Sequence, residues 1–143
     1  FGALAIIERF EQYGVTIREV INCGGVSEKN EMLMQIYADV TGREMKISRS
    51  AQTCALGSAI AAAVAAGKER GGFDDFDAAQ SAMCEVKDIS YKPDPENHEL
   101  YQGLFRLYMQ LHDAFGLKDT PGDLSNVMKD LLAIKERVTA QYV

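Results

Sequence analysis

Tryptophan is absent from this sequence of 143 residues, and only three prolines, three cysteines and two histidines occur. The cysteines, Cys23, Cys54 and Cys84, are odd in number and lack C-x-x-C spacing, which argues against a disulfide framework and a zinc site. Reduced thiols in the cytoplasm are the better interpretation. His98 and His112 fall in one predicted helix, about 21 Å apart by its rise, so they cannot share a metal and are predicted to be solvated.

Positive charge is also scarce, because 15 basic residues face 21 acidic ones and the net charge is −6. A nucleic-acid surface needs clustered Lys and Arg, so a nucleic-acid partner is not expected. The longest apolar run, Ala59 to Ala66, is too short to span a bilayer, and no membrane partner is expected. The chain also has no GxxxxGK[ST], GxGxxG or GxSxG motif.

The most informative stretch runs from Arg18 to Ser27, where the apolar residues Val20 and Ile21 precede the glycine pair Gly24-Gly25. An apolar segment, two glycines and an amphipathic pattern predict a strand, a tight turn and a helix N-terminus, which α/β proteins use to hold phosphates. Glycine suits this turn because a Cβ would keep backbone N–H groups away from an anion. By itself, the pair predicts only a strand-to-helix turn.

Periodicity and capping signals predict the remaining elements. The small residues of the Thr53–Ala66 segment indicate a helix that packs tightly against a neighbour, with Gly57 placed for close approach. In the helix that opens at Asp94, we expect Leu100, Leu104, Tyr108, Leu111 and Phe115 to form the apolar stripe. We expect six helices: one up to Gly14, one from Ser27 as N-cap to Gly42, one over 53–66, one from the Asp74–Asp77 cluster to Met83, one from Asp94 to Gly116 and one from Asp123 or Ser125 onward. We expect strands over 15–23, 45–48 and 86–91.

These elements predict an α/β fold that is mostly helical, with two or three strands. The first strand reads as a buried parallel strand. A doubly wound sheet needs covered faces and paired edges, and two convincing strands with one doubtful strand are too few to form one. We therefore expect the missing strands before Phe1 and interpret the chain as a fragment of a larger protein.

The stretch from Gly24 to Gly42 contains Gly-Gly, Asn30 a turn later, and then Gln35-x-x-Ala-Asp39-x-x-Gly42. This pattern resembles the nucleotide-binding signature of the FGGY carbohydrate kinases. The segment Thr53-Cys-Ala-Leu-Gly-Ser-Ala59 resembles the family's second block, with serine in place of one alanine. The resemblance covers roughly residues 1 to 118.

The resemblance implies part of an actin-like ATPase domain of the ribonuclease H-like type, with ATP held in a cleft between two domains. Residues 1–92 would belong to the C-terminal nucleotide-binding domain and residues 93–143 to a helical extension. Gly24 and Gly25 would approach the phosphates and ribose, and Asn30 would contact the adenine. Asp39 is expected to cap or pair structurally, and a packing role explains Gln35 at least as well as contact with a ligand. The resemblance implies that the catalytic base lies in a Gly-Asp motif upstream of this region, so the full enzyme would supply it together with Mg²⁺.

Within the family, the residues from Leu33 to Arg43, the Ser50–Thr53 segment and the Tyr91–His98 segment resemble the branch that phosphorylates L-ribulose, a ketopentose, in arabinose catabolism. Two alternatives stay open. One is another kinase of the family, acting on xylulose, glycerol or gluconate. The other is a non-catalytic actin-like module that binds nucleotide and signals to a partner. A homo-oligomer is also left open.

Overall fold

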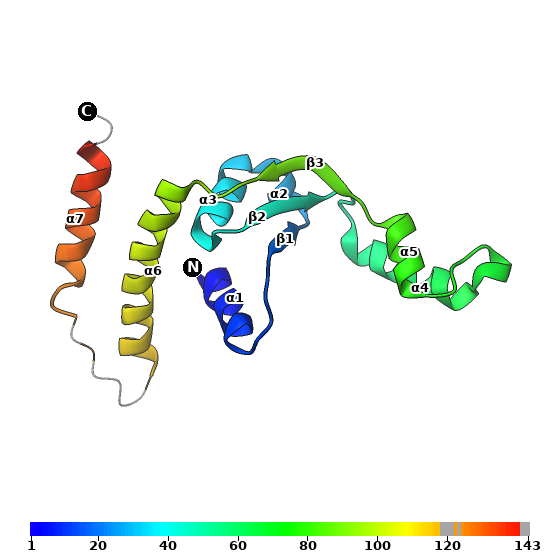
Figure 1. Cartoon of the computed structure of the whole chain (residues 1–143), viewed down its shortest axis with the longest axis horizontal. Helices are drawn as coiled ribbons and strands as arrows, with labels where there is room; N and C mark the ends of the chain where they lie inside the picture. Colours follow the sequence, from blue (N-terminus) through cyan, green and yellow to red (C-terminus); the bar gives the residue numbers. More distant parts are fainter. Residues whose placement is uncertain (118–121, 123, 141–143) are drawn as a thin grey trace.

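A mixed three-stranded sheet lies at the centre of the computed structural model, which describes residues 1–117, 122 and 124–140 (Figure 1). The strands β1 (Glu19–Asn22), β2 (Glu44–Ser48) and β3 (Val86–Tyr91) lie in the order β1-β2-β3. β1 and β2 are parallel, with Val20 opposite Met45, whereas β2 and β3 are antiparallel. The strands predicted over 45–48 and 86–91 are confirmed.

β1 is shorter and more exposed than the sequence predicted. Only residues 19–22 of the predicted strand over 15–23 are paired, and Ile21 is 53% exposed. The prediction of a buried strand was wrong for the described part of the chain, because β1 lies at one edge of the sheet. Val20, in contrast, is half-buried beside β2.

The helix predicted from Ser27 to Gly42 is two helices, α2 (Gly25–Lys29) and α3 (Glu31–Thr41). Ser27 is not a cap; it lies inside α2, where its hydroxyl donates to the Gly24 carbonyl at 2.8 Å. Asn30 separates the helices with φ −131° and ψ 83° and caps α3 by accepting from the Leu33 N–H at 2.9 Å. Gly42 ends α3 in the left-handed conformation, as predicted.

The hydrophobic core joins three helices beside the sheet. Leu4 of α1 (Gly2–Gln12), Val40 of α3 and Phe105 of α6 (Pro95–Gly116) are all buried together. The Phe1 ring lies 5.8 Å from the Phe105 ring, centroid to centroid. The stripe predicted for α6 was misplaced, since Phe105 and Leu107 are its buried residues while Phe115 is 81% exposed. α6 packs against α3 on one side and α7 on another, so its apolar face is not the one predicted.

At the far end of the molecule lie α4 (Thr53–Ala66), the 3₁₀ turn η1 (Lys68–Arg70) and α5 (Phe76–Met83) (Figure 1). The bounds of α4 and α5 match the prediction, and the Asp75 carboxylate caps α5 by accepting from the Ala78 N–H at 2.7 Å. Tight packing of α4 is not seen in the described residues: Ile60 is its only buried residue. A Cβ on Gly57 would meet nothing within 4 Å.

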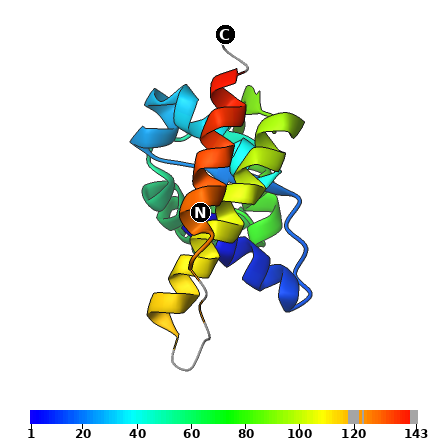
Figure 2. The ribbon, with the colours of Figure 1, turned by 90° about the vertical axis from the view of Figure 1, so that its left-hand side faces the viewer.

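α7 (Val127–Ala140) runs beside α6 at the opposite end of the molecule (Figures 1 and 2). The cap Asp94-Pro95 and the end of α6 at Gly116 are confirmed, with the Asp94 carboxylate accepting from the Glu96 and Asn97 N–H groups. α7 begins later than predicted, at Val127; Asp123 lies outside the described residues. In the described part of the chain, no helix is both long and apolar enough to cross a membrane.

Candidate functional site

The glycine turn joins the end of β1 to α2. Gly24 has φ 90° and ψ 171°, a conformation that residues other than glycine rarely adopt. Gly25 has no positive φ and is the first residue of α2. A Cβ built on either glycine would meet nothing within 4 Å, so the space in front of the turn is open. The backbone therefore favours glycine at position 24, whereas at position 25 both the backbone and the open space would also accept a side chain.

Asn30 lies at the other end of α2, exposed to solvent. Since α2 has five residues, Gly24 and Asn30 are about 9 Å apart along the helix rise. The Asn30 side-chain oxygen is engaged by the Leu33 N–H, which leaves the amide NH₂ as the group that can donate to a ligand. The structure thus places the predicted residues at the two ends of α2, with the glycines at its start and Asn30 after its last residue.

A hollow of about 490 Å³ adjoins this turn on the side of α4. It lies at the carboxyl ends of β1 and β2, where open α/β sheets bind ligands. Cys23, next to Gly24, lines it, but Gly24, Gly25 and Asn30 do not. Its wall is mostly apolar and carries two of the free thiols; it consists of Ile21, Cys23, Ser48, Thr53, Leu56, Gly57, Ile60, Cys84, Glu85 and Val86.

Asp39 forms a buried polar cluster where α3 meets the start of α6. Asp39 is only 2% exposed to solvent. The carboxylate accepts hydrogen bonds from the Gln35 amide and the Asp94 N–H, each at 2.8 Å, and from the Asn97 amide at 3.2 Å. The structural role predicted for Asp39 is confirmed, and Gln35 is engaged by Asp39 and by the Lys92 carbonyl. Sequence alone did not identify their partners at Lys92, Asp94 and Asn97, because those residues lie more than fifty positions further along the chain.

His98 belongs to the same cluster, and the prediction that it is solvated was wrong. Its Nδ1–H donates to the Asp39 carbonyl at 2.7 Å, and the side chain is partly buried. The imidazole lies against Gly42, where a Cβ would come within 2.7 Å of His98 Cε1. His112 is exposed, as predicted, with its Nδ1 3.0 Å from the Asp113 carboxylate.

Two ion pairs brace β1 and β2 near their amino ends, at the other end of β1 from the glycine turn. Arg43, after α3, donates to the carbonyls of Ile17 and Thr41 and to the Glu11 carboxylate. The hydrogen bond from Arg43 lowers the pKa of Glu11 below its ordinary value. Across the sheet, the Glu19 carboxylate 2.6 Å from Lys46 Nζ raises the pKa of that ammonium group.

α2 is also anchored by an ion pair, because Lys87 of β3 lies 3.0 Å from the Glu28 carboxylate. This contact joins the short helix between the candidate residues to the strand at the far edge of the sheet. The sequence gives no signal for it, since the partners are 59 residues apart.

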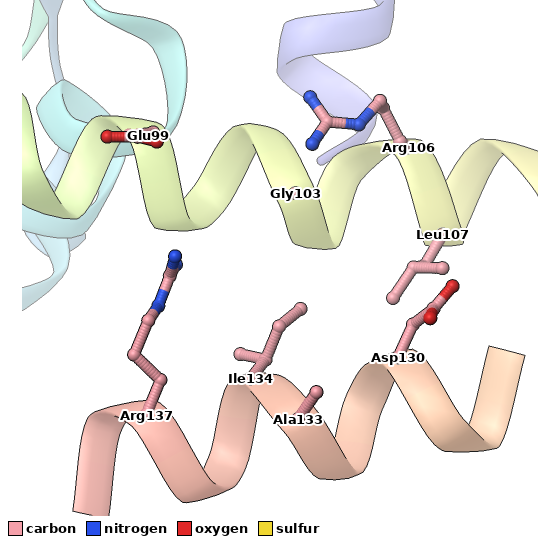
Figure 3. Close-up of a pocket in the computed structure, with 8 residues that line it drawn as sticks. All are labelled: Glu99, Gly103, Arg106, Leu107, Asp130, Ala133, Ile134 and Arg137. Atoms are coloured by element: carbon pink, nitrogen blue, oxygen red, sulfur yellow. The ribbon is translucent and has the colours of Figure 1, made fainter. Parts of the chain in front are cut away.

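A second hollow, of about 400 Å³, separates α6 from α7 (Figure 3). Gly103 and Ile134 occupy its middle, and charged residues lie towards both of its ends. Arg137 points towards the segment that carries Glu99, and Asp130 lies opposite the turn of Arg106, whose side chain points away from it. The sequence analysis did not anticipate this hollow, because it depends on how the two helices are placed.

Within the residues that the structure describes, no group of three or more His, Cys, Asp and Glu side chains could hold a metal ion. The described side chains therefore do not form a metal site of their own.

Comparison with known proteins gives consistent similarities. Residues 1–66 match the C-terminal domain of the FGGY family of carbohydrate kinases. The chain is 47% identical over 135 residues to a ribulokinase of Halalkalibacterium halodurans, and 46% identical over 140 residues to one of Geobacillus thermodenitrificans. These alignments cover 94% and 98% of this chain but 23% and 24% of the relatives, so the chain spans about a quarter of their length.

The structure of a ligand-bound xylulose kinase from Lactobacillus acidophilus shares the fold. It superimposes with a TM-score of 0.58 at 23% sequence identity, over 69% of this chain and 19% of the kinase. The mostly helical α/β arrangement around a small sheet therefore occurs within a larger protein of known structure.

Proposed function

We propose, from the premise that residues 1–66 belong to the FGGY family of carbohydrate kinases as its C-terminal domain, that this chain is the ATP-binding C-terminal portion of a ribulokinase. The full protein would transfer the γ-phosphoryl group of ATP to L-ribulose and form L-ribulose 5-phosphate, in the cytoplasmic catabolism of L-arabinose. The observation that carries the proposal is 46–47% identity to ribulokinases over nearly the whole chain.

The proposed architecture is an actin-like, ribonuclease H-like domain over residues 1–92, followed by a helical extension over residues 93–143. The parallel pair β1 and β2, joined through α2 and α3, supports this assignment. α6 and α7 constitute the described part of the extension. The extension is not detached, because the Asp39 cluster joins α6 to α3.

Gly24, Gly25 and Asn30 are the proposed nucleotide contacts. The open space at both glycines lets a phosphate or ribose approach the backbone, and the Asn30 amide NH₂ can donate to a ring nitrogen of adenine. α2 has only five residues, so its N-terminus supplies less favourable potential for an anion than the long helix that the sequence predicted. We assign Mg²⁺ to the ATP phosphates and to the rest of the full protein.

The substrate is tested with the full-length protein in a coupled assay of ADP release. We expect kcat/KM to be highest with L-ribulose among L-ribulose, xylulose, glycerol and gluconate. Equal or greater kcat/KM with another of these substrates would reassign the enzyme within its family. No turnover with any of them would contradict the kinase assignment.

The site is tested by Gly25→Val in the full-length protein. The backbone at this position tolerates a side chain, so loss of ATP affinity would come from occupied space and not from strain. We expect KM for ATP to rise about tenfold, which corresponds to roughly 1.4 kcal/mol, with KM for the sugar unchanged.

Gly116→Val is the matched control, because Gly116 also has open space and no positive φ but lies at the end of α6. It should leave both constants unchanged. A folded Gly25→Val variant with the KM for ATP of the wild type would show that the glycine serves only the turn.

A further inference from the structure

We propose that Asp39 is a positioning residue for nucleotide binding: its buried carboxylate fastens the start of α6 to the C-terminal half of α3, and thereby fixes the direction of α3, whose other end carries Asn30. This inference rests on the proposed function. Asp39 would act on nucleotide binding without touching the ligand. The helical extension would in this way help to fix the geometry of the nucleotide site.

The carboxylate is held by neutral donors from two separate elements. Its Oδ1 accepts from Gln35 Nε2, one turn earlier on α3, and from the Asp94 N–H at the start of α6. Its Oδ2 accepts from Asn97 Nδ2 in the first turn of α6. A buried charge is tolerated only when hydrogen bonds satisfy it, so the carboxylate requires α6 to stay in this place.

The arrangement also suits the electrostatics of α6. This helix has 22 residues, and the carboxylate lies at its N-terminal end, where the positive end of the helix dipole stabilises negative charge. Two further hydrogen bonds close the junction: Gln35 Nε2 donates to the Lys92 carbonyl at 2.8 Å, and His98 Nδ1 donates to the Asp39 carbonyl at 2.7 Å. Side chain and backbone of one residue thus bind the same segment.

α3 transmits this attachment to the candidate site. It is an uninterrupted helix of eleven residues, with Asp39 near its end and Asn30 as its cap at the start. Asn30 also follows α2 directly. The other end of α2 is the glycine turn, which the hydrogen bond between the Ser27 hydroxyl and the Gly24 carbonyl closes. A tilt of α3 at the Asp39 end would therefore move Asn30 relative to Gly24.

The geometry allows a test at the level of single atoms. In Asp39→Asn, the amide oxygen keeps the Gln35 and Asp94 donors, but the new NH₂ faces the NH₂ of Asn97. In Asn97→Asp, two carboxylates face one another instead. Combining the substitutions restores a donor opposite an acceptor, since the amide introduced at position 39 can then donate to the carboxylate introduced at position 97.

The experiment measures the Kd of ATP by calorimetric titration, the KM for L-ribulose and the melting temperature of the full-length variants. Each single substitution should weaken ATP binding about threefold to tenfold, the scale of coupling through packed networks, and leave the KM for L-ribulose within about twofold. The double variant should return to within about twofold of the wild-type Kd. Asp113→Asn, at the exposed end of α6, is the control and should change neither constant.

A merely structural role would lower the melting temperature and leave the Kd of the folded protein unchanged, and this result would overturn the proposal. A double variant no better than the single ones would also overturn it. Absence of ATP binding by the wild type would remove the proposed function and this inference together. That failure is distinguishable, because the wild type is titrated first.

Discussion

At the scale of single residues, Gly42 is fixed by its backbone and by its neighbour. Its φ is +65°, and an added Cβ would lie 2.7 Å from His98 Cε1. Gly42→Ala should therefore lower the free energy of unfolding by about 1–2 kcal/mol for the left-handed backbone alone, and further by displacing His98. Urea denaturation of the full-length protein measures the change.

Gly57 provides the matched substitution for that measurement. It lies inside α4 without a positive φ, and a Cβ there meets nothing within 4 Å. In this environment Gly57→Ala should stabilise the helix by about 0.4–1 kcal/mol. Destabilisation by Gly57→Ala in the full-length protein would instead show that this face of α4 packs closely against the remainder, as the sequence suggested.

Glu11 should make stability depend on pH in the acid range. Its pKa in the folded state lies below the ordinary value of 4.5, because Arg43 donates a hydrogen bond to the carboxylate. A lowered folded pKa means that the contribution to stability is complete above the unfolded pKa and is lost as pH falls through the folded pKa. Glu11→Gln should therefore reduce stability at neutral pH and have no effect in strong acid.

The measurement compares urea midpoints of wild type and Glu11→Gln as a function of pH. Arg43→Lys is a second variant, because lysine cannot reproduce the fork that reaches Ile17, Thr41 and Glu11 together. It should show the same loss of acid dependence with a lower midpoint overall. A constant difference between wild type and Glu11→Gln across the range would contradict the assigned cause.

At the scale of elements, α6 and α7 have complementary charges across the hollow between them. Glu99 and Arg137 lie towards one end of the pair, and Arg106 and Asp130 towards the other (Figure 3). Glu99→Arg should loosen α7, and adding Arg137→Glu should restore its attachment, each by about 0.2–1 kcal/mol as for exposed ion pairs. Amide hydrogen exchange of residues 127–140 measures this attachment.

If the charges do not attract across the hollow, the effects of the two substitutions will simply add, and exchange in α7 will not recover. Exchange in α3 is the internal control. It should stay constant in all three variants, because α3 is attached to α6 through Asp39 and not through α7.

At the scale of the whole molecule, the edge of the sheet is exposed at β1. Ile21 is 53% exposed there, and an uncovered edge strand with apolar side chains attracts further strands. The 143-residue chain expressed by itself should therefore associate with increasing concentration, and Ile21→Lys should reduce this association. Light scattering after size-exclusion chromatography decides the outcome, and a monomer at all concentrations would contradict it.

The same chain, purified alone, should show no sugar-dependent release of ADP. The family resemblance implies that the Gly-Asp motif with the catalytic base lies upstream of this region, whereas Gly122-Asp123 lies towards the other end of the chain. Phosphoryl transfer also needs a positioned hydroxyl group. The coupled assay with L-ribulose and Mg-ATP tests this directly. Turnover above background would mean that the catalytic machinery lies within these residues.

The sequence by itself determined the local features of this protein. Asp94-Pro95, Asp75, Gly42 and the bounds of α4 could all be predicted, because caps, helix ends and periodicity depend on neighbours within a few residues. The family resemblance could be recognised for the same reason, since its motifs are contiguous. The residues of the candidate site, Gly24, Gly25 and Asn30, were likewise chosen from a local pattern.

Only the tertiary structure decided which residues meet across long separations. It split the predicted helix at Asn30, where a side-chain cap stabilises a new start, and it assigned the positive φ to Gly24 and not to Gly25. It also packed His98 against Gly42 and placed the side chain of Asp39 against the start of α6. Periodicity cannot reveal such contacts, because a buried hydrogen bond depends on where two separate elements are placed by the packing of the whole chain.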